Sequence, residues 1–119
     1  MIKKYIYVTT QKEDFHSYPD APTEVAFLRN VHRHLFKIKL KIEIFDNNRE
    51  LEFFIVQRKL NDILLLTDFN CSCENIASQI LDAVKLIYPN RDISCEVSED
   101  GENGGIIEWQ AEQMSLKEF

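Results

Sequence analysis

The chain has 119 residues, of which 45% are hydrophobic and 29% charged, and this is the size and composition of one ordinary globular domain, residues 1–119. Its formal net charge of −6 argues against binding driven by nucleic-acid phosphates, which needs a dense basic surface. No stretch of the sequence approaches the ~20 apolar residues of a membrane-spanning helix, so we expect neither a nucleic-acid partner nor a membrane partner.

The first half of the chain predicts two strands separated by a long loop. Residues 2–10, IKKYIYVTT, are rich in β-branched and aromatic residues and predict a strand. Residues 11–30 contain two prolines and many polar residues, so we expect a loop there with at most one short helical turn. Residues 34–45 predict the second strand, because apolar and polar residues alternate along it. Its apolar face consists of Phe36, Ile38, Leu40, Ile42 and Ile44.

Two amphipathic helices are predicted after a turn at residues 46–50. The first spans about 52–65, where apolar residues recur at spacings of three and four: Phe53, Val56, Leu60 and Ile63. The second spans about 73–88, with an apolar stripe of Ile76, Ile80, Val84 and Ile87. Ser72 is suited to cap the N-terminus of this helix, and Pro89 follows its end.

A hairpin completes the predicted fold. Residues 93–99 alternate as a strand, and SEDGENGG at 98–105 predicts a turn that contains all three glycines of the chain. GIIEWQA at 105–111 predicts the last strand, whereas the tail at 113–119 is uninformative. The order ββααββ predicts an α+β fold, in which an antiparallel four-stranded sheet carries two helices on one face.

A histidine pair lies at the start of the second predicted strand. His32 and His34 are two residues apart, so their side chains share one face at a spacing of about 6.6–6.8 Å. Two imidazoles so placed can converge on one ion, and His16 can join them if the first two strands pair. Three histidine ligands leave a fourth position of a zinc ion open to a ligand. The alternative is a set of partly buried, hydrogen-bonded histidines without a metal.

Arg33 lies between the two histidines and faces the other side of the strand, near Lys37 and Lys39. This basic face is either a solvated or subunit-contacting surface or a cationic rim that binds a phosphate.

The cysteines indicate a reducing compartment. Cys71, Cys73 and Cys95 are an odd number and do not make a disulfide framework. The N-terminal MIKKYIYVTT lacks the apolar run of a signal peptide, so we expect a cytoplasmic protein.

Several motifs in order resemble the T-fold family of 6-pyruvoyltetrahydropterin and 6-carboxytetrahydropterin synthases, over nearly the whole chain. The family's first-strand histidine corresponds to His16, and its HGH-aromatic motif to HRHLF at 32–36. ELEFFIVQRKLNDIL at 50–64 looks like the start of the family's first helix, with its hydrophobic-D-F-x-x-L-K pattern. SCENIASQILDAV at 72–84 is similar to the family's P-T-x-E-N-[IL]-A helix, and ISCEVSED at 93–100 to its V-x-V-x-E-T strand.

The resemblance implies a T-fold with a zinc ion held by His16, His32 and His34, where the metal polarises substrate oxygen atoms. It also implies that Glu99 accepts hydrogen bonds from the N–H edge of a pterin- or purine-like ring. T-fold proteins close into multi-subunit barrels with the ligand site at a subunit interface. We therefore expect a homo-oligomer, specifically a hexamer, in which closure covers the open edges of the sheet.

The chain departs from the family pattern at the catalytic positions. Leu28 occupies the place of the family's cysteine, four residues before the histidine pair, and Phe69 the place of its histidine. Glu24 and Asp68 are the remaining candidates for acid–base catalysis.

These departures imply a protein that binds a pterin- or purine-like ligand without normal synthase catalysis. Because the hairpin VSEDGENG is similar to that of small bacteriophage proteins, sequestration of a host nucleotide signal is one such role. An active lyase on a dihydroneopterin triphosphate-type substrate is the alternative. A structural module with incidental histidines is a third interpretation.

Overall fold

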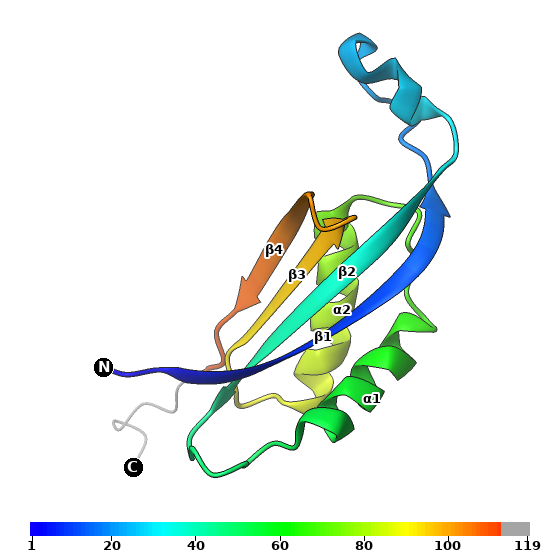
Figure 1. The fold of residues 1–119 in the computed structure, drawn as a ribbon. Coiled ribbons are helices and arrows are strands. Elements are labelled where there is room, and N and C mark those ends of the chain that lie inside the picture. The colour runs from blue at the N-terminus through cyan, green and yellow to red at the C-terminus, as the bar shows by residue number, and fades with distance from the viewer. Residues whose placement is uncertain (113–119) are drawn as a thin grey trace.

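The computed structural model describes residues 1–112, and the tail at 113–119, for which no element was predicted, lies outside these residues. The described chain forms four strands, two α-helices and one 3-10 helix (Figure 1). In chain order these are β1 (Lys4–His16), η1 (Thr23–Arg29), β2 (His32–Ile44), α1 (Phe53–Leu64), α2 (Cys73–Ile87), β3 (Ile93–Glu99) and β4 (Asn103–Trp109).

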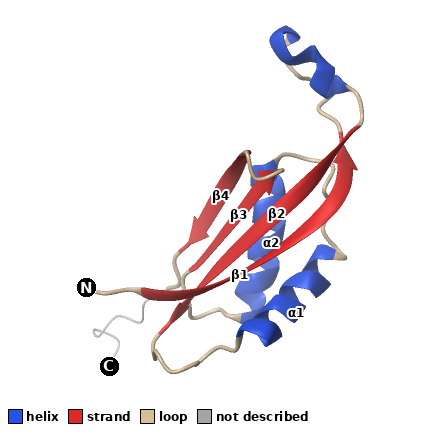
Figure 2. Ribbon diagram, viewed as in Figure 1, coloured by secondary structure: helices blue, strands red, loops and turns tan. Residues whose placement is uncertain are grey.

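The strands form one antiparallel sheet in the order β1-β2-β3-β4, and the two α-helices lie on one face of it (Figure 2). Helix α2 packs against β3 and β4, and α1 packs against β1. The predicted α+β class, the antiparallel four-stranded sheet and the element order are confirmed.

The core lies between the sheet and the helices and follows the predicted alternation of β2. Phe36, Ile38, Leu40 and Ile42 are at most 2% exposed. They pack in one cluster with the buried stripes of the helices, which include Val56, Leu60, Ile76, Ile80 and Val84. The predicted stripes therefore cover the sheet, except that Phe53 and Ile87 are 57% and 40% exposed and that Leu64 is buried in α1 instead.

Strand β1 is six residues longer at its C-terminal end than the predicted strand at 2–10. Each residue from Lys4 to His16 pairs with a residue of β2, so the predicted start of a loop at residue 11 is wrong. Residues 11–15 belong to an edge strand and are exposed or half-buried in alternation, which allows the polar sequence QKED within a strand. The extension brings His16 into the sheet.

The β3–β4 turn is shorter than predicted, and β4 begins at Asn103 instead of residue 105. Asp100 and Gly101 have positive φ values of 57° and 77°, and Glu102 N donates to Glu99 O at 3.0 Å. Gly104 lies within β4, where an added Cβ would come 2.1 Å from Val97 O. Two of the glycines that indicated a turn thus permit close contacts within a strand.

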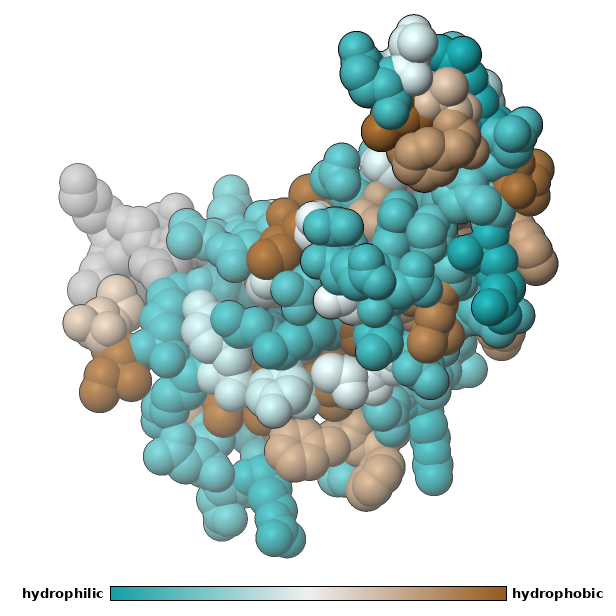
Figure 3. All heavy atoms as spheres, turned by 45° about the horizontal axis from the view of Figure 1, so that its top comes forward, coloured by the Kyte–Doolittle hydropathy of each residue, from teal (hydrophilic) through white to brown (hydrophobic). Residues whose placement is uncertain are grey.

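The segment 17–31, which contains η1, extends beyond the ends of β1 and β2, away from the helices (Figure 1). Several apolar side chains on it are exposed: Tyr18 (50%), Phe27 (70%) and Val31 (71%). In the space-filling view, hydrophobic groups on this protruding segment stand among hydrophilic ones (Figure 3). Within residues 1–112, neither the length nor the hydropathy of any helix suits it to span a membrane.

Candidate metal centre

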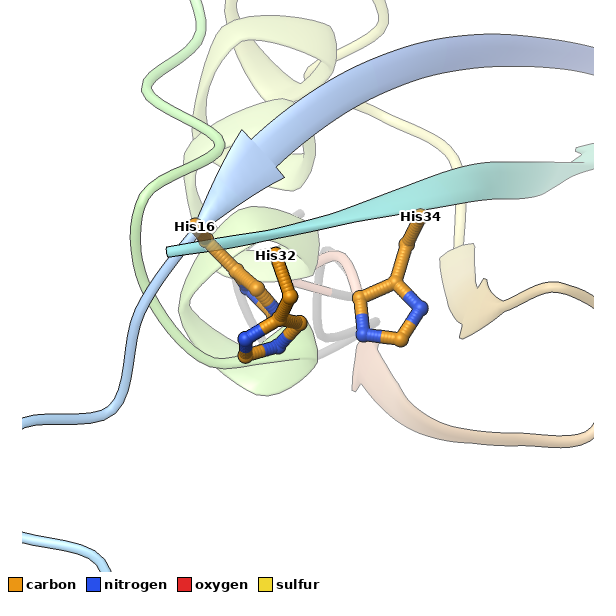
Figure 4. A group of neighbouring side chains, drawn as sticks. All are labelled: His16, His32 and His34. Carbon is orange, nitrogen blue, oxygen red and sulfur yellow. The ribbon is translucent and has the colours of Figure 1, made fainter. Parts of the chain in front are cut away.

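The register of β1 and β2 brings the three histidines together at one end of the sheet. His16 is paired directly with His32, and His34 is two residues further along β2. Directly opposed residues and residues two apart project from the same face of a sheet. The three rings accordingly lie on the same side of the two strands (Figure 4).

The histidine side chains are close enough to share one ion. One ring nitrogen from each of His16, His32 and His34 lies within 4.8 Å of the others. Their ring centroids are 4.6 to 5.0 Å apart and the rings are nearly perpendicular, with interplanar angles of 75° to 87°. This group could therefore hold a metal ion, as predicted from the spacing of the histidines.

Each of the three imidazoles has an oxygen acceptor at its Nδ1 atom. His16 Nδ1 lies 3.2 Å from Cys71 O, and His32 Nδ1 lies 2.7 Å from Asn30 O. His34 Nδ1 lies 2.7 Å from Asp100 Oδ2. Carbonyl and carboxylate oxygens only accept hydrogen bonds, so Nδ1 carries the proton in each neutral ring. The Nε2 lone pairs are then free for a metal, which is the arrangement common around histidine ligands.

The environment of His34 Nε2 favours a cation at this site. This nitrogen is buried and has no hydrogen-bond partner among the described residues, and no other buried side-chain nitrogen or oxygen of these residues lacks one. A buried polar atom without a partner is costly, and an ion at this position would satisfy its lone pair. The donor set of three imidazole nitrogens suits zinc, among other transition metals.

Glu99 places a carboxylate beside the histidines from the end of β3. Its Oε1 lies 3.6 Å from His16 Nε2, and its Oε2 lies 3.4 Å from His34 Nε2. The side chain is 33% exposed, so one part of it remains open to a ligand. Cys73 Sγ lies 3.9 Å from Glu99 Oε1, and burial, with a further contribution from the Glu99 charge, raises the pKa of this thiol to about 12.

A hollow of about 400 Å³ adjoins the histidines. His16, His32 and Glu99 line it together with residues from two other parts of the chain: Ser17, Tyr18 and Leu28 from the protruding segment, and Cys71, Ser72 and Asn75 from the start of α2. This volume lies within the range of small-molecule sites. Burial raises the pKa of the Cys71 thiol, with a smaller contribution from Asp68.

The other residues that the sequence suggested lie apart from this hollow. Glu24 is exposed on η1. Asp68 Oδ1 accepts from Asn70 N at 2.8 Å. Arg33 Nη1 lies 3.0 Å from Glu13 Oε2, on the face of the strand opposite to the histidines. Phe69 is buried and packs against Phe36, with ring centroids 5.2 Å apart.

Sequence reasoning did not place Asp100 or Cys71 beside the histidines. The motifs that contain Asp100 gave its side chain no role, yet its carboxylate contacts His34 and accepts from Leu35 N at 2.8 Å. The Leu35 N–H, followed by the His34 contact, holds the pKa of Asp100 below its usual value. Cys71 lies 55 residues beyond His16 along the chain, so no local pattern connects them.

No family model matches this chain, and no curated protein matches it in sequence.

Proposed function

We propose that the chain is a diverged T-fold-like protein that binds a pterin- or purine-like small molecule at a zinc centre of His16, His32 and His34. The observation that carries this proposal is the convergence of three imidazoles whose Nδ1 atoms all face oxygen acceptors. With the proton on Nδ1, the Nε2 lone pair of each ring is available to a cation, and three such ligands leave one coordination position of zinc open to a small molecule. A bound zinc ion would act there as a Lewis acid on ligand oxygen atoms.

Glu99 is the proposed anchor for the ring of the ligand. Its carboxylate lies in the hollow and offers two acceptors to two adjacent N–H donors, the edge that pterins and purines such as guanine present. Tyr18 and Leu28 supply apolar surface to the same hollow, which suits a flat heterocycle. In this proposal the histidines orient the polar substituent of the ligand and Glu99 orients its ring.

The surroundings of the hollow favour binding over synthase catalysis. Leu28 lines it at the position of the family's cysteine and cannot transfer a proton. Asp68 is engaged by a backbone N–H, and Glu24 lies exposed on η1. The Cys71 thiol lines the hollow, but its raised pKa keeps it protonated at neutral pH and unsuited to act as a base. Sequestration of a nucleotide signal, as in a phage counter-defence protein, needs such a site without turnover.

A homo-oligomer, specifically a hexamer, is part of this proposal. Within residues 1–112, β1 and β4 are the edge strands of the sheet, and the hollow is bordered by a protruding segment with exposed apolar side chains. Closure of several copies into a barrel would cover such edges.

Two experiments test the proposed function. Native mass spectrometry of protein purified from its own host should show the oligomer with bound zinc and any retained ligand. Zinc-loaded protein should then bind a pterin or a guanine nucleotide in calorimetry without releasing triphosphate from dihydroneopterin triphosphate. Triphosphate release would instead establish the lyase alternative, and a protein that no added zinc can load would refute the metal centre.

A further inference from the structure

We infer that Asp100 is a positioning residue that holds His34 in the Nδ1–H tautomer and so presents the His34 Nε2 lone pair to the metal. This inference rests on the metal centre proposed above. It assigns a role to a residue of the β3–β4 turn that provides no ligand atom itself.

The position of Asp100 follows from the way the β2–β3 ladder ends. The last paired residues are Phe36 and Glu99, and beyond them the chain turns toward β4. Asp100 N still donates to Leu35 O at 2.8 Å, but the Asp100 carbonyl no longer takes part in the ladder. The side chain replaces it, because Asp100 Oδ1 accepts from Leu35 N at 2.8 Å. The backbone of β2 thereby fixes the carboxylate.

The second oxygen of the same carboxylate is then directed at His34. Asp100 Oδ2 lies 2.7 Å from His34 Nδ1, a distance typical of a strong, charge-assisted hydrogen bond. The opposite nitrogen of this ring, Nε2, is the buried atom without a hydrogen-bond partner within residues 1–112. Glu99 Oε2 lies 3.4 Å from this Nε2, so the 2.7 Å contact with Asp100 is the shorter of the two carboxylate contacts to the ring and favours the proton on Nδ1. A carboxylate at one nitrogen and a lone pair available at the other is the usual environment of a metal-ligating histidine.

The backbone at Asp100 supports a specific role. Its φ of 57° lies in the left-handed region, which is uncommon for residues other than glycine and is adopted most readily by asparagine and aspartate. The φ value alone would allow asparagine or glycine at this position. Only a carboxylate can accept from both Leu35 N–H and His34 Nδ1–H, one on each oxygen.

The variant Asp100→Asn separates these two requirements. Its amide oxygen can still accept from Leu35 N–H, which preserves the turn. The amide NH₂ group then faces His34 Nδ1 and donates to it, which favours the opposite tautomer with the proton on Nε2. A matched control is Asp46→Asn, because Asp46 Oδ1 also accepts a backbone N–H, that of Asn48 at 2.7 Å, in the turn between β2 and α1.

The tautomers can be read from long-range ¹H–¹⁵N spectra of the metal-free protein at mildly alkaline pH, and zinc affinity from competition with a chelator. We expect His34 in the wild type to carry its proton on Nδ1. In Asp100→Asn we expect the proton on Nε2, and zinc affinity about 10–100-fold lower. Asp46→Asn should resemble the wild type in both measurements.

The outcomes separate this inference from the proposed function. A wild-type His34 with its proton on Nε2 overturns the inference without any variant. Wild-type protein that binds zinc, together with an Asp100→Asn variant of unchanged affinity, overturns the inference but leaves the metal centre intact. Wild-type protein that binds no transition metal refutes the proposed centre, and with it the role of Asp100 toward a metal.

Discussion

His16 and His32 occupy directly opposed positions in the antiparallel ladder of β1 and β2, with ring centroids 4.6 Å apart. The geometry of the candidate metal centre is therefore set by the register of one strand pair. A slip of one residue between these strands would turn one ring to the opposite face of the sheet. The alternation of buried residues along β2 opposes such a slip, because it would expose the core face.

Replacement of one histidine should abolish stable zinc binding. We expect His32→Ala to lose most of its zinc, since two imidazoles are a weak site. Elemental analysis of zinc-loaded, desalted protein provides the measurement. Arg33→Ala is the matched control, because the neighbouring side chain is 61% exposed on the opposite face, and it should retain zinc as the wild type does. Equal zinc contents in the two variants would contradict the three-histidine centre.

Removal of the Glu99 charge should weaken ligand binding without removing zinc. We expect Glu99→Gln to bind a pterin or a guanine nucleotide about 10–100-fold less tightly, the effect of one or two hydrogen bonds to a charged acceptor. Glu96→Gln serves as the control, because Glu96 faces the opposite side of β3. Calorimetry with zinc-loaded protein measures both affinities. Loss of zinc from Glu99→Gln would instead identify Glu99 as a metal ligand.

The thiols should differ in their reactivity toward a maleimide. Cys71 is partly exposed in the hollow, whereas Cys73 and Cys95 are buried with pKa values raised to about 12. We expect Cys71 to be labelled first in native protein, since thiolate formation and access both limit the reaction. Mass spectrometry of peptides identifies the labelled site, and a bound ligand should slow the labelling. Preferential labelling of Cys95 would contradict the described packing.

Acid should destabilise the protein partly through Asp92. The Lys3 ammonium that donates to this carboxylate holds its pKa below the usual value. A lowered folded-state pKa contributes stability above the unfolded value, about 3.9, and this contribution is lost as pH falls through the folded pKa.

We therefore expect Asp92→Asn to be less stable than the wild type at neutral pH, with a difference that shrinks in strong acid. Urea unfolding at several pH values measures this difference. The control Asp82→Asn alters a carboxylate that is 72% exposed and paired with Lys85, and it should be nearly neutral throughout.

Gly104 should be the least replaceable glycine of the β3–β4 hairpin. A Cβ there would come 2.1 Å from Val97 O, so the backbone must move, and we expect Gly104→Ala to lower the free energy of unfolding by about 1–3 kcal/mol. Gly105→Ala meets the flexible Glu74 Cγ at 2.9 Å and should cost less. Urea unfolding compares the two variants. Because the hairpin carries Glu99, we also expect Gly104→Ala to weaken ligand binding.

The sequence was sufficient for the parts of the fold in which one face is buried. The alternation in β2, the capping of α2 by Ser72 and the bounds of β3 were all predictable, because each depends on local patterns. The approach of His16 to His32 and His34 was also predictable from strand pairing. The capping of α1 was not predicted. Glu52 caps this helix by accepting from Ile55 N at 2.9 Å, and glutamate is not among the usual N-cap residues.

The remainder depended on contacts between distant parts of the chain. The extension of β1 through QKED is held by its pairing with β2, and its polar residues gave no strand pattern of their own. Gly104 and Gly105 indicated a turn, since a sequence does not distinguish a glycine needed for positive φ from one needed for close approach. The role of Asp100 was equally unpredictable, because its carboxylate meets His34 only once β2 and β3 are paired.

Glu99 and Asp100 are consecutive residues where β3 turns toward β4, and their carboxylates approach opposite nitrogens of His34, Nε2 and Nδ1, while Glu99 also lines the hollow. Because a single peptide unit joins the two residues, we expect a molecule that binds the Glu99 carboxylate to change the position or the mobility of Asp100 as well. By thermodynamic reciprocity, an ion that binds better in the presence of that molecule will in turn retain the molecule more tightly.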